Sequence, residues 1–88
     1  MNVDPSVIAA LEASVEADPD RDPVRLHLID LLLAAERWAD AAVHTAVLLA
    51  RRPDDTEALA RAAASADGAG NREQADGYRR LLQALGHR

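Results

Sequence analysis

A dipeptide that recurs at a fixed distance constrains the fold of this chain more than any other feature. Proline followed by aspartate occurs at Pro19-Asp20 and again at Pro53-Asp54, 34 residues later. Fixed periods of this size are typical of architectures in which helix pairs are repeated and stacked. Proline also ends helices, because it lacks the backbone N–H that the helical hydrogen-bond ladder needs. We therefore expect an all-α fold, an antiparallel array of about five helices joined as hairpins.

The composition supports helices and excludes several kinds of site. The apolar residues are mainly Ala and Leu with some Val, Phe is absent, and Trp38 and Tyr78 are the only aromatic residues. This mixture is rich in helix formers and poor in strand formers. Because the chain has no cysteine, disulfides and thiolate zinc sites are excluded. A reducing cytoplasm is the expected location.

The charged residues argue against two further classes of partner and chemistry. The net charge is −5, and all ten basic residues are arginines. Scattered arginines on an acidic surface form no continuous track for phosphates, so nucleic acid is not an expected partner. Without lysine, a Walker-type phosphate loop and Schiff-base catalysis are also excluded. We expect no cofactor.

The sequence contains no segment typical of a membrane span or a targeting signal. The longest uncharged apolar run, residues 31–35, is far too short to cross a bilayer. The first residues lack the basic and then apolar pattern of a signal peptide. We expect a soluble chain that begins at its own start codon and has no membrane partner.

Capping and breaking residues place the helices along the chain. Asp4-Pro5 and Asp22-Pro23 both resemble helix openings, in which the carboxylate caps and proline occupies the first turn. Asp54 or Asp55 can cap a further helix, and Asn71 can cap the last one. The predicted helices lie near 5–17, 23–35, 38–51, 56–67 and from Asn71 to about 85. The second of them is apolar around more than half of its circumference, which predicts a central position.

Residues 22–55 resemble one tetratricopeptide repeat, and residues 56–85 resemble a second, weaker one. The matching positions in the first repeat are Leu28, Leu32, Trp38, Ala41, Leu48 and Pro53. Arg25, Ile29 and Glu36 depart from the pattern, because they stand where it has Trp, Gly and the turn Gly. The first helix would be the second half of an incomplete repeat that ends at Pro19. A plain helical bundle is the alternative architecture.

The resemblance implies a protein-binding module in which an extended peptide lies in a groove. That groove is lined by the first helix of each pair, and here its residues would be Leu26, Asp30, Leu33, Glu57 and Arg61. Family members that hold a C-terminal carboxylate use Lys and Asn at positions that carry Leu26 and Asp30 here, so this clamp is missing. The alternative is that Leu26 and Leu33 are buried beneath the first helix.

A second, narrower resemblance concerns residues 4–20 and 26–54. These segments look like the start of certain AAA+ ATPases of high-GC Gram-positive bacteria (actinobacteria), the valosin-containing-protein-like unfoldases associated with the proteasome. The resemblance implies that residues 1–88 are a single helical domain at the N-terminus of a longer protein. This domain would recruit substrates or adaptors to an ATPase ring. The chain itself has no ATPase motif and is not expected to be an enzyme.

Two alternatives to a recruitment domain remain open, a free-standing scaffold or oligomerisation module and a small-molecule or metal-binding helical domain. Asp18, Asp20 and Asp22 are spaced like the opening of a calcium loop. Such a loop needs glycine at its sixth position and glutamate at its twelfth, which are Pro23 and Ile29 here. We therefore interpret these aspartates as a helix stop, a turn and a cap, and expect no metal site.

Two histidines have a carboxylate near them on the same predicted helix. His27 lies three residues from Asp30, and His44 lies four residues from Asp40. Such neighbours attract weakly at helical spacing, and no nucleophile accompanies them, so the pattern does not predict catalysis. Five arginines could form a basic patch, but we expect a solvated face and helix-end cations instead: Arg51, Arg52, Arg72, Arg79 and Arg80.

Overall fold

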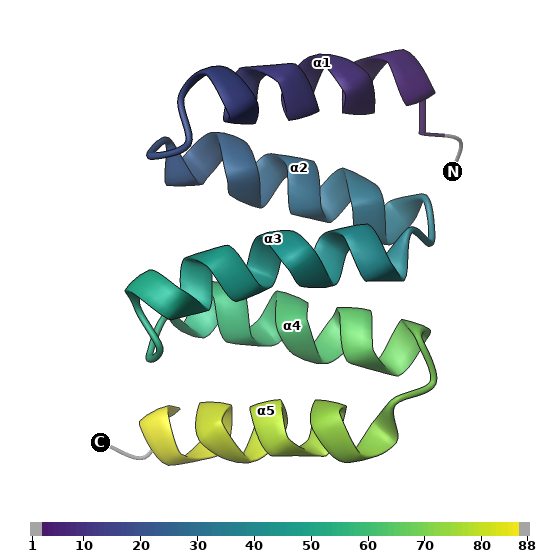
Figure 1. Ribbon diagram of the computed structural model, residues 1–88. Helices are drawn as coiled ribbons and strands as arrows, with labels where there is room; N and C mark the ends of the chain where they lie inside the picture. Colours follow the sequence, from purple (N-terminus) through teal and green to yellow (C-terminus); the bar gives the residue numbers. More distant parts are fainter. Residues whose placement is uncertain (1–2, 87–88) are drawn as a thin grey trace.

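Five helices account for most of the chain in a computed structural model, which describes residues 3–86. The helices are α1 (Pro5–Ala17), α2 (Asp22–Ala34), α3 (Trp38–Arg51), α4 (Thr56–Gly68) and α5 (Arg72–Gly86). Each runs antiparallel to the next, and they stack in chain order with α3 in the middle (Figure 1). Residues 3–86 contain no strand. The predicted all-α hairpin array is confirmed.

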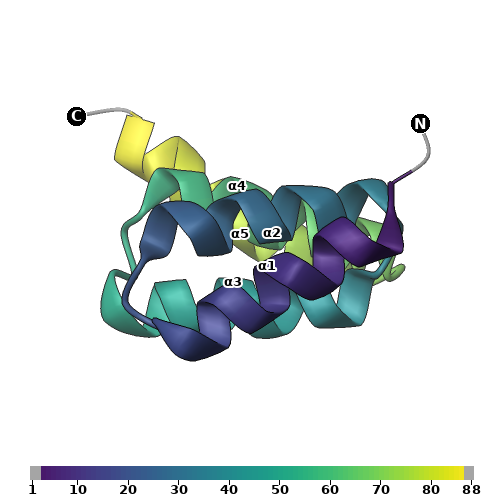
Figure 2. The ribbon, with the colours of Figure 1, turned by 90° about the horizontal axis from the view of Figure 1, so that it is seen from above.

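The stack is thin, because each helix packs mainly on its neighbours in sequence. Its principal extents are 38 × 27 × 17 Å. Viewed from above, α2 and α4 lie on one side of the stack and α3 on the other (Figure 2). Besides its sequence neighbours α1 and α3, α2 also contacts α4. The first helices of the two predicted repeats therefore lie side by side.

The predicted caps at three helix starts are confirmed. A carboxylate oxygen of Asp4 accepts a hydrogen bond from the backbone N–H of Ser6 at 2.9 Å. Asp55 Oδ1 accepts from the N–H groups of Glu57 and Ala58 at 3.0 and 3.3 Å. At the start of α5, Asn71 Oδ1 accepts from the N–H of Gln74, and its amide donates to the Gln74 side chain. These bonds satisfy donors that have no partner within the helix.

The predicted cap at Asp22 is wrong. The residue that precedes α2 is Arg21, which makes no side-chain capping bond, and Asp22 is the first residue of the helix. The carboxylate of Asp22 instead accepts hydrogen bonds from Arg51 at 2.7 Å and Arg52 at 3.0 Å. Charge-assisted bonds of this kind are stronger than a bond to a neutral N–H. The two arginines at the end of α3 therefore outcompete the backbone.

The turns inside the two hairpins have the same geometry. Glu36 and Gly70, which are one 34-residue period apart, both have positive φ, 59° and 81°. The N–H that follows each of them returns to a carbonyl five residues earlier, Arg37 to Leu32 at 2.9 Å and Asn71 to Ala66 at 2.8 Å. This is the Schellman pattern, whose left-handed residue is usually glycine. The first hairpin makes this turn with a glutamate.

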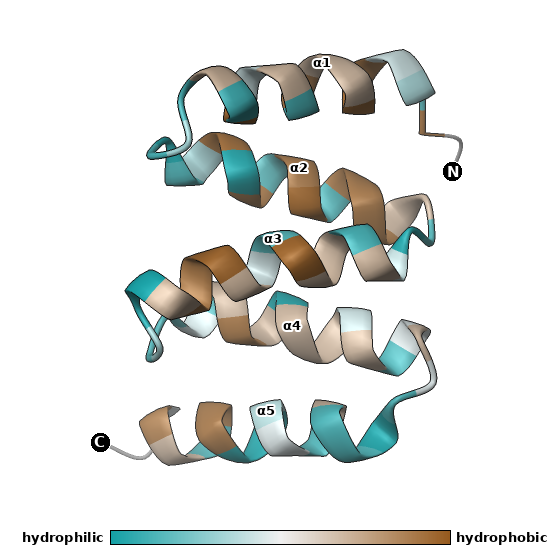
Figure 3. Ribbon diagram, in the orientation of Figure 1, coloured by the Kyte–Doolittle hydropathy of each residue, from teal (hydrophilic) through white to brown (hydrophobic). Residues whose placement is uncertain are grey.

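The core combines a few large side chains with many alanines. The largest fully buried side chains are Leu28, Ile29, Leu32, Leu48 and Leu59. Six alanines of α3, α4 and α5 are also buried, and they allow close helix approach: Ala41, Ala58, Ala62, Ala63, Ala66 and Ala75. Hydrophobic residues concentrate on α2 and α3, whereas the first half of α5 is mostly hydrophilic (Figure 3). This distribution agrees with the predicted central position of the second helix.

The indole of Trp38, at the start of α3, lies directly against Gly68, at the end of α4. A Cβ atom built on Gly68 would lie 2.3 Å from Cδ2 of the indole and 2.4 Å from Cε2. A real Cβ essentially never approaches a carbon atom so closely. The absence of a side chain at Gly68 therefore sets the distance between these two helix ends.

Candidate functional site

The five predicted groove residues lie on α2 and α4, the two helices that pack side by side. Asp30 and Arg61 are joined across the two helices by two hydrogen bonds, Nε to Oδ1 at 2.7 Å and Nη2 to Oδ2 at 3.0 Å. A further guanidinium N–H of Arg61 donates to the carbonyl of Glu57 at 3.0 Å. The bonds to Asp30 raise the pKa of Arg61, although partial burial opposes the change. A fixed ion pair thus spans the predicted groove.

The two leucines of the predicted groove are neither fully buried nor fully exposed. Leu26 and Leu33 are both half-buried and pack against the core cluster. They are seven residues apart, which is two helical turns, so they lie on the same face of α2 with Asp30 between them. Each leaves part of its apolar surface accessible to a partner.

At one end of the predicted groove lies a pocket with a cavity volume of about 450 Å³. It lies between the first turns of α2 and α4 and the segment that joins α3 to α4. Its lining is mainly acidic around two apolar residues: Asp22, Pro23, Leu26, Arg52, Asp54, Asp55, Thr56 and Glu57. Leu26 and Glu57 belong to the predicted groove. The other lining residues were not predicted, because the turn between α3 and α4 was considered only as a helix boundary.

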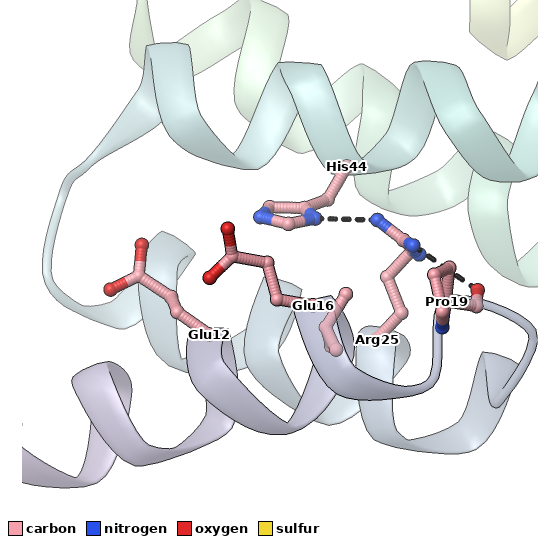
Figure 4. Close-up of a pocket in the computed structure, with 6 residues that line it drawn as sticks. Glu12, Glu16, Pro19, Arg25 and His44 are labelled. Carbon is pink, nitrogen blue, oxygen red and sulfur yellow. Dashed lines mark hydrogen bonds between the residues drawn. The ribbon is translucent and has the colours of Figure 1, made fainter.

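A second pocket, of about 460 Å³, lies where α1, α2 and α3 meet (Figure 4). The guanidinium of Arg25 extends across it from α2. One Nη donates to His44 Nδ1 at 2.9 Å and the other donates to the carbonyl of Pro19 at 3.2 Å. Arg25 is only 6% exposed, and its Nε has no hydrogen-bond partner. Where the repeat pattern has an aromatic residue, this chain therefore buries an arginine that ties two helices and a turn together.

The bond to Arg25 fixes the protonation state of His44. A guanidinium can only donate, so Nδ1 must be the acceptor, and the proton of the neutral imidazole is on Nε2. Burial lowers the pKa of His44, and the charge of Arg25 lowers it further, while Glu12 and Asp40 act in the opposite direction. Burial also lowers the pKa of Arg25. The carboxylates of Glu12 and Glu16 extend from α1 into the same pocket (Figure 4).

Neither Asp30 nor Asp40 makes a hydrogen bond to the histidine near it on the same helix, although the charge of Asp40 acts to raise the pKa of His44. Asp30 bonds to Arg61, as described above, and Asp40 accepts from Arg37 Nε at 2.9 Å. The hydroxyl of Thr45, next to His44 in sequence, donates to the carbonyl of Ala42 at 3.0 Å. Thr45 is thus not aligned with the imidazole as a nucleophile would be.

Two aspartates of the turn after α1 pair with two arginines of the predicted surface face. Asp22 binds Arg51 and Arg52, and Asp20 lies 3.7 Å from Arg51. On α5, Arg79 forms ion pairs with Asp67 and Asp76. Within residues 3–86 no group of three or more His, Asp or Glu side chains has a placement that could hold a metal ion.

The period could have indicated the Asp30–Arg61 pair. Position 64 is the equivalent of Asp30 one repeat later, and Arg61 is one helical turn before it. Two helices that are equivalent in the repeat lie side by side in such arrays, so opposite charges one turn apart can meet. The pair between Arg25 and His44 had no comparable signal in the sequence.

Across the part of the chain that the structure describes, no helix has the length and apolar character needed to span a membrane. A family model described as tetratricopeptide repeat matches residues 6–66. This range takes in almost all of α1, the whole of α2 and α3, and most of α4. Among curated proteins and among solved structures the comparison finds no significant match.

Proposed function

Because the chain belongs to the tetratricopeptide repeat family, we propose that it is a non-catalytic module that binds an extended polypeptide in the groove between α2 and α4. Tetratricopeptide repeats in general mediate protein–protein interaction. The observation that carries the proposal for this chain is the groove itself. It combines partly exposed leucines, a fixed ion pair and a pocket on two helices that lie side by side.

The chemistry of the groove suits a polypeptide better than a small molecule. Leu26 and Leu33 offer two apolar contacts along α2, about two helical turns apart. Glu57 is exposed on the neighbouring helix, one turn before Arg61, and can hydrogen-bond to a partner. Such alternation of apolar and polar contacts along a surface fits the alternating side chains of an extended peptide.

We further propose that the domain is the N-terminal recruitment domain of a cytoplasmic AAA+ unfoldase that works with a bacterial proteasome. The resemblance of residues 4–20 and 26–54 to the start of such ATPases supports this role. The domain would hold a substrate or an adaptor near the ring, and ATP hydrolysis would take place elsewhere in the protein. An AAA+ reading frame directly after Arg88 in the gene would support this assignment, whereas a stop codon there would refute it in favour of a free-standing scaffold.

Site-specific crosslinking tests the groove. A photoreactive amino acid replaces Glu57, which is exposed in the groove, or Val43, which is 63% exposed on α3. We expect residue 57 to capture a reproducible set of proteins from a lysate and residue 43 to capture none of them. Thermal melts of both variants verify the fold. If position 43 captures the same proteins as position 57, or if position 57 captures nothing above background, the groove is not the binding surface.

A further inference from the structure

The charges along the groove between α2 and α4 are balanced at its centre but not at its pocketed end. At the centre, Asp30 and Arg61 neutralise one another. At the end, Asp22 is paired with both Arg51 and Arg52. Within residues 3–86 no arginine forms a salt bridge with the three other acidic residues of the pocket, Asp54, Asp55 and Glu57. The pocket therefore retains negative charge that the fold itself does not neutralise.

The first turns of α2 and α4 compensate only the charge of Asp55. A helix N-terminus favours anions because its first N–H groups have no partner in the helix. In α4, Asp55 already accepts from two of these N–H groups, and in α2 the second residue is Pro23, which has none. Within the described part of the chain, Asp54 and Glu57 are therefore the two exposed carboxylates of the pocket that neither a helix N-terminus nor a salt bridge neutralises. The guanidinium of Arg52, which also lines the pocket, is bound to Asp22.

The apolar part of the lining restricts the kind of cation that fits. Pro23 and the half-buried Leu26 contribute apolar surface beside the carboxylates. A small hydrated ion gains nothing from such surface, whereas the methylene stem of lysine or arginine does. The volume of about 450 Å³ lies within the range of about 300–1,000 Å³ that is typical of ligand pockets.

We propose that this pocket binds a lysine or arginine side chain of the polypeptide in the groove. The aliphatic stem packs on Leu26 and Pro23, and the cationic head lies between the exposed carboxylates of Asp54 and Glu57. This inference rests on the proposed function and makes it more specific. The preferred partner is an extended segment with a basic residue at a fixed position.

Four pools of fluorescein-labelled peptides test the inference by fluorescence anisotropy. Each pool has a fixed central residue, Lys, Arg, norleucine or Glu, between randomised neutral positions. Norleucine keeps the aliphatic stem without the charge. We expect the Lys and Arg pools to bind about two- to thirtyfold more tightly than the norleucine pool, because ion pairs with the two exposed carboxylates, Asp54 and Glu57, add to the contact of the aliphatic stem. The difference should shrink as the salt concentration rises.

A double variant identifies the carboxylates. Asp54→Asn with Glu57→Gln should remove most of the preference for Lys and Arg and leave binding of the norleucine pool unchanged. The control, Glu16→Gln with Glu73→Gln, removes two exposed carboxylates from α1 and α5 and should preserve the preference. Thermal melts of both variants check that they fold.

The outcomes separate this inference from the proposed function. If the norleucine pool binds as tightly as the Lys pool, and Leu26→Ser weakens both, the groove binds peptides without a cation anchor and only the inference fails. If the control variant loses the preference as fully as the pocket variant, general charge is responsible, and the inference also fails. If no pool binds, both the inference and peptide binding in this groove are refuted.

Discussion

Replacing Gly68 with alanine tests whether close approach between α3 and α4 determines the stability of this domain. In the helix interior, Gly→Ala normally stabilises a protein by about 0.5–1 kcal/mol, because alanine loses less backbone entropy on folding. At Gly68 the new Cβ would overlap the indole of Trp38, at 2.3 Å from Cδ2. The atoms affected belong to the rigid ring, so no small rotation of a flexible chain end relieves the overlap.

The overlap should outweigh the gain in propensity. Overpacking of a well-packed contact costs about 1–3 kcal/mol, because neighbouring side chains and backbone must shift. After subtraction of the entropic gain, Gly68→Ala should lower the free energy of unfolding by about 1 kcal/mol. For a domain of this size, that corresponds to a fall in Tm of about 4–8 °C. Urea unfolding followed by circular dichroism, together with thermal melts, would measure both quantities.

Gly77 provides the matched control, because it lies inside α5 and a Cβ there would meet no atom within 4 Å. Gly77→Ala should stabilise the domain by about 0.5–1 kcal/mol. A double-mutant cycle isolates the steric effect, since Gly68→Ala should no longer destabilise in a Trp38→Leu background. If Gly68→Ala stabilises the native protein as much as Gly77→Ala does, the contact with Trp38 does not set the helix spacing.

Two further predictions concern Glu36 and His44. Glu36 has a left-handed backbone, which costs a non-glycine residue about 1–2 kcal/mol, whereas the greater flexibility of glycine in the unfolded chain costs about 0.5–1 kcal/mol. Glu36→Gly should therefore raise the free energy of unfolding, measured by urea titration, by up to about 1 kcal/mol. Glu36→Ala should not raise it. Folding lowers the pKa of His44, so the unfolded chain binds a proton at this residue more readily than the folded chain does. The contribution of His44 to the free energy of unfolding should therefore be fully present above the unfolded pKa of about 6.5 and should decline as the pH falls below it. His44→Gln should weaken this decline in melts at several pH values, and an unchanged decline would exclude His44 as its source.

The features that sequence reasoning located correctly depend on residues close together in the chain. Asp4, Asp55 and Asn71 each cap a helix by accepting from an N–H two or three residues away. Such a bond needs only the local backbone, so the residue type and its position before a helix are sufficient to predict it. Asp22 has the same local context, but its partners, Arg51 and Arg52, are 29 and 30 residues away. The role of Asp22 is therefore set by tertiary contacts, which its local sequence does not indicate.

The ion pairs and the pockets depend on tertiary packing for the same reason. Helical spacing places Asp40 near His44, but the hydrogen-bond partner of the imidazole is Arg25, 19 residues away on another helix. The proposed groove residues rest on the 34-residue period, which identifies α2 and α4 as equivalent helices but does not give their relative shift along the axis. The pocket at the end of the groove was missed, because it requires the turn between α3 and α4 to close over the first turn of α2.

The residues that set the helix spacing are different from those that line the pocket, so binding specificity can change without a change in the core. Helix spacing is set by buried alanines and by the contact between Gly68 and Trp38, none of which lines the pocket. Asp54 and Glu57 are exposed, and surface substitutions usually change stability by no more than about 0.5 kcal/mol. Exchange of these carboxylates can therefore alter partner preference at nearly constant stability. Gly68→Ala should conversely lower Tm without changing the peptide preference, provided that the domain remains folded at the assay temperature.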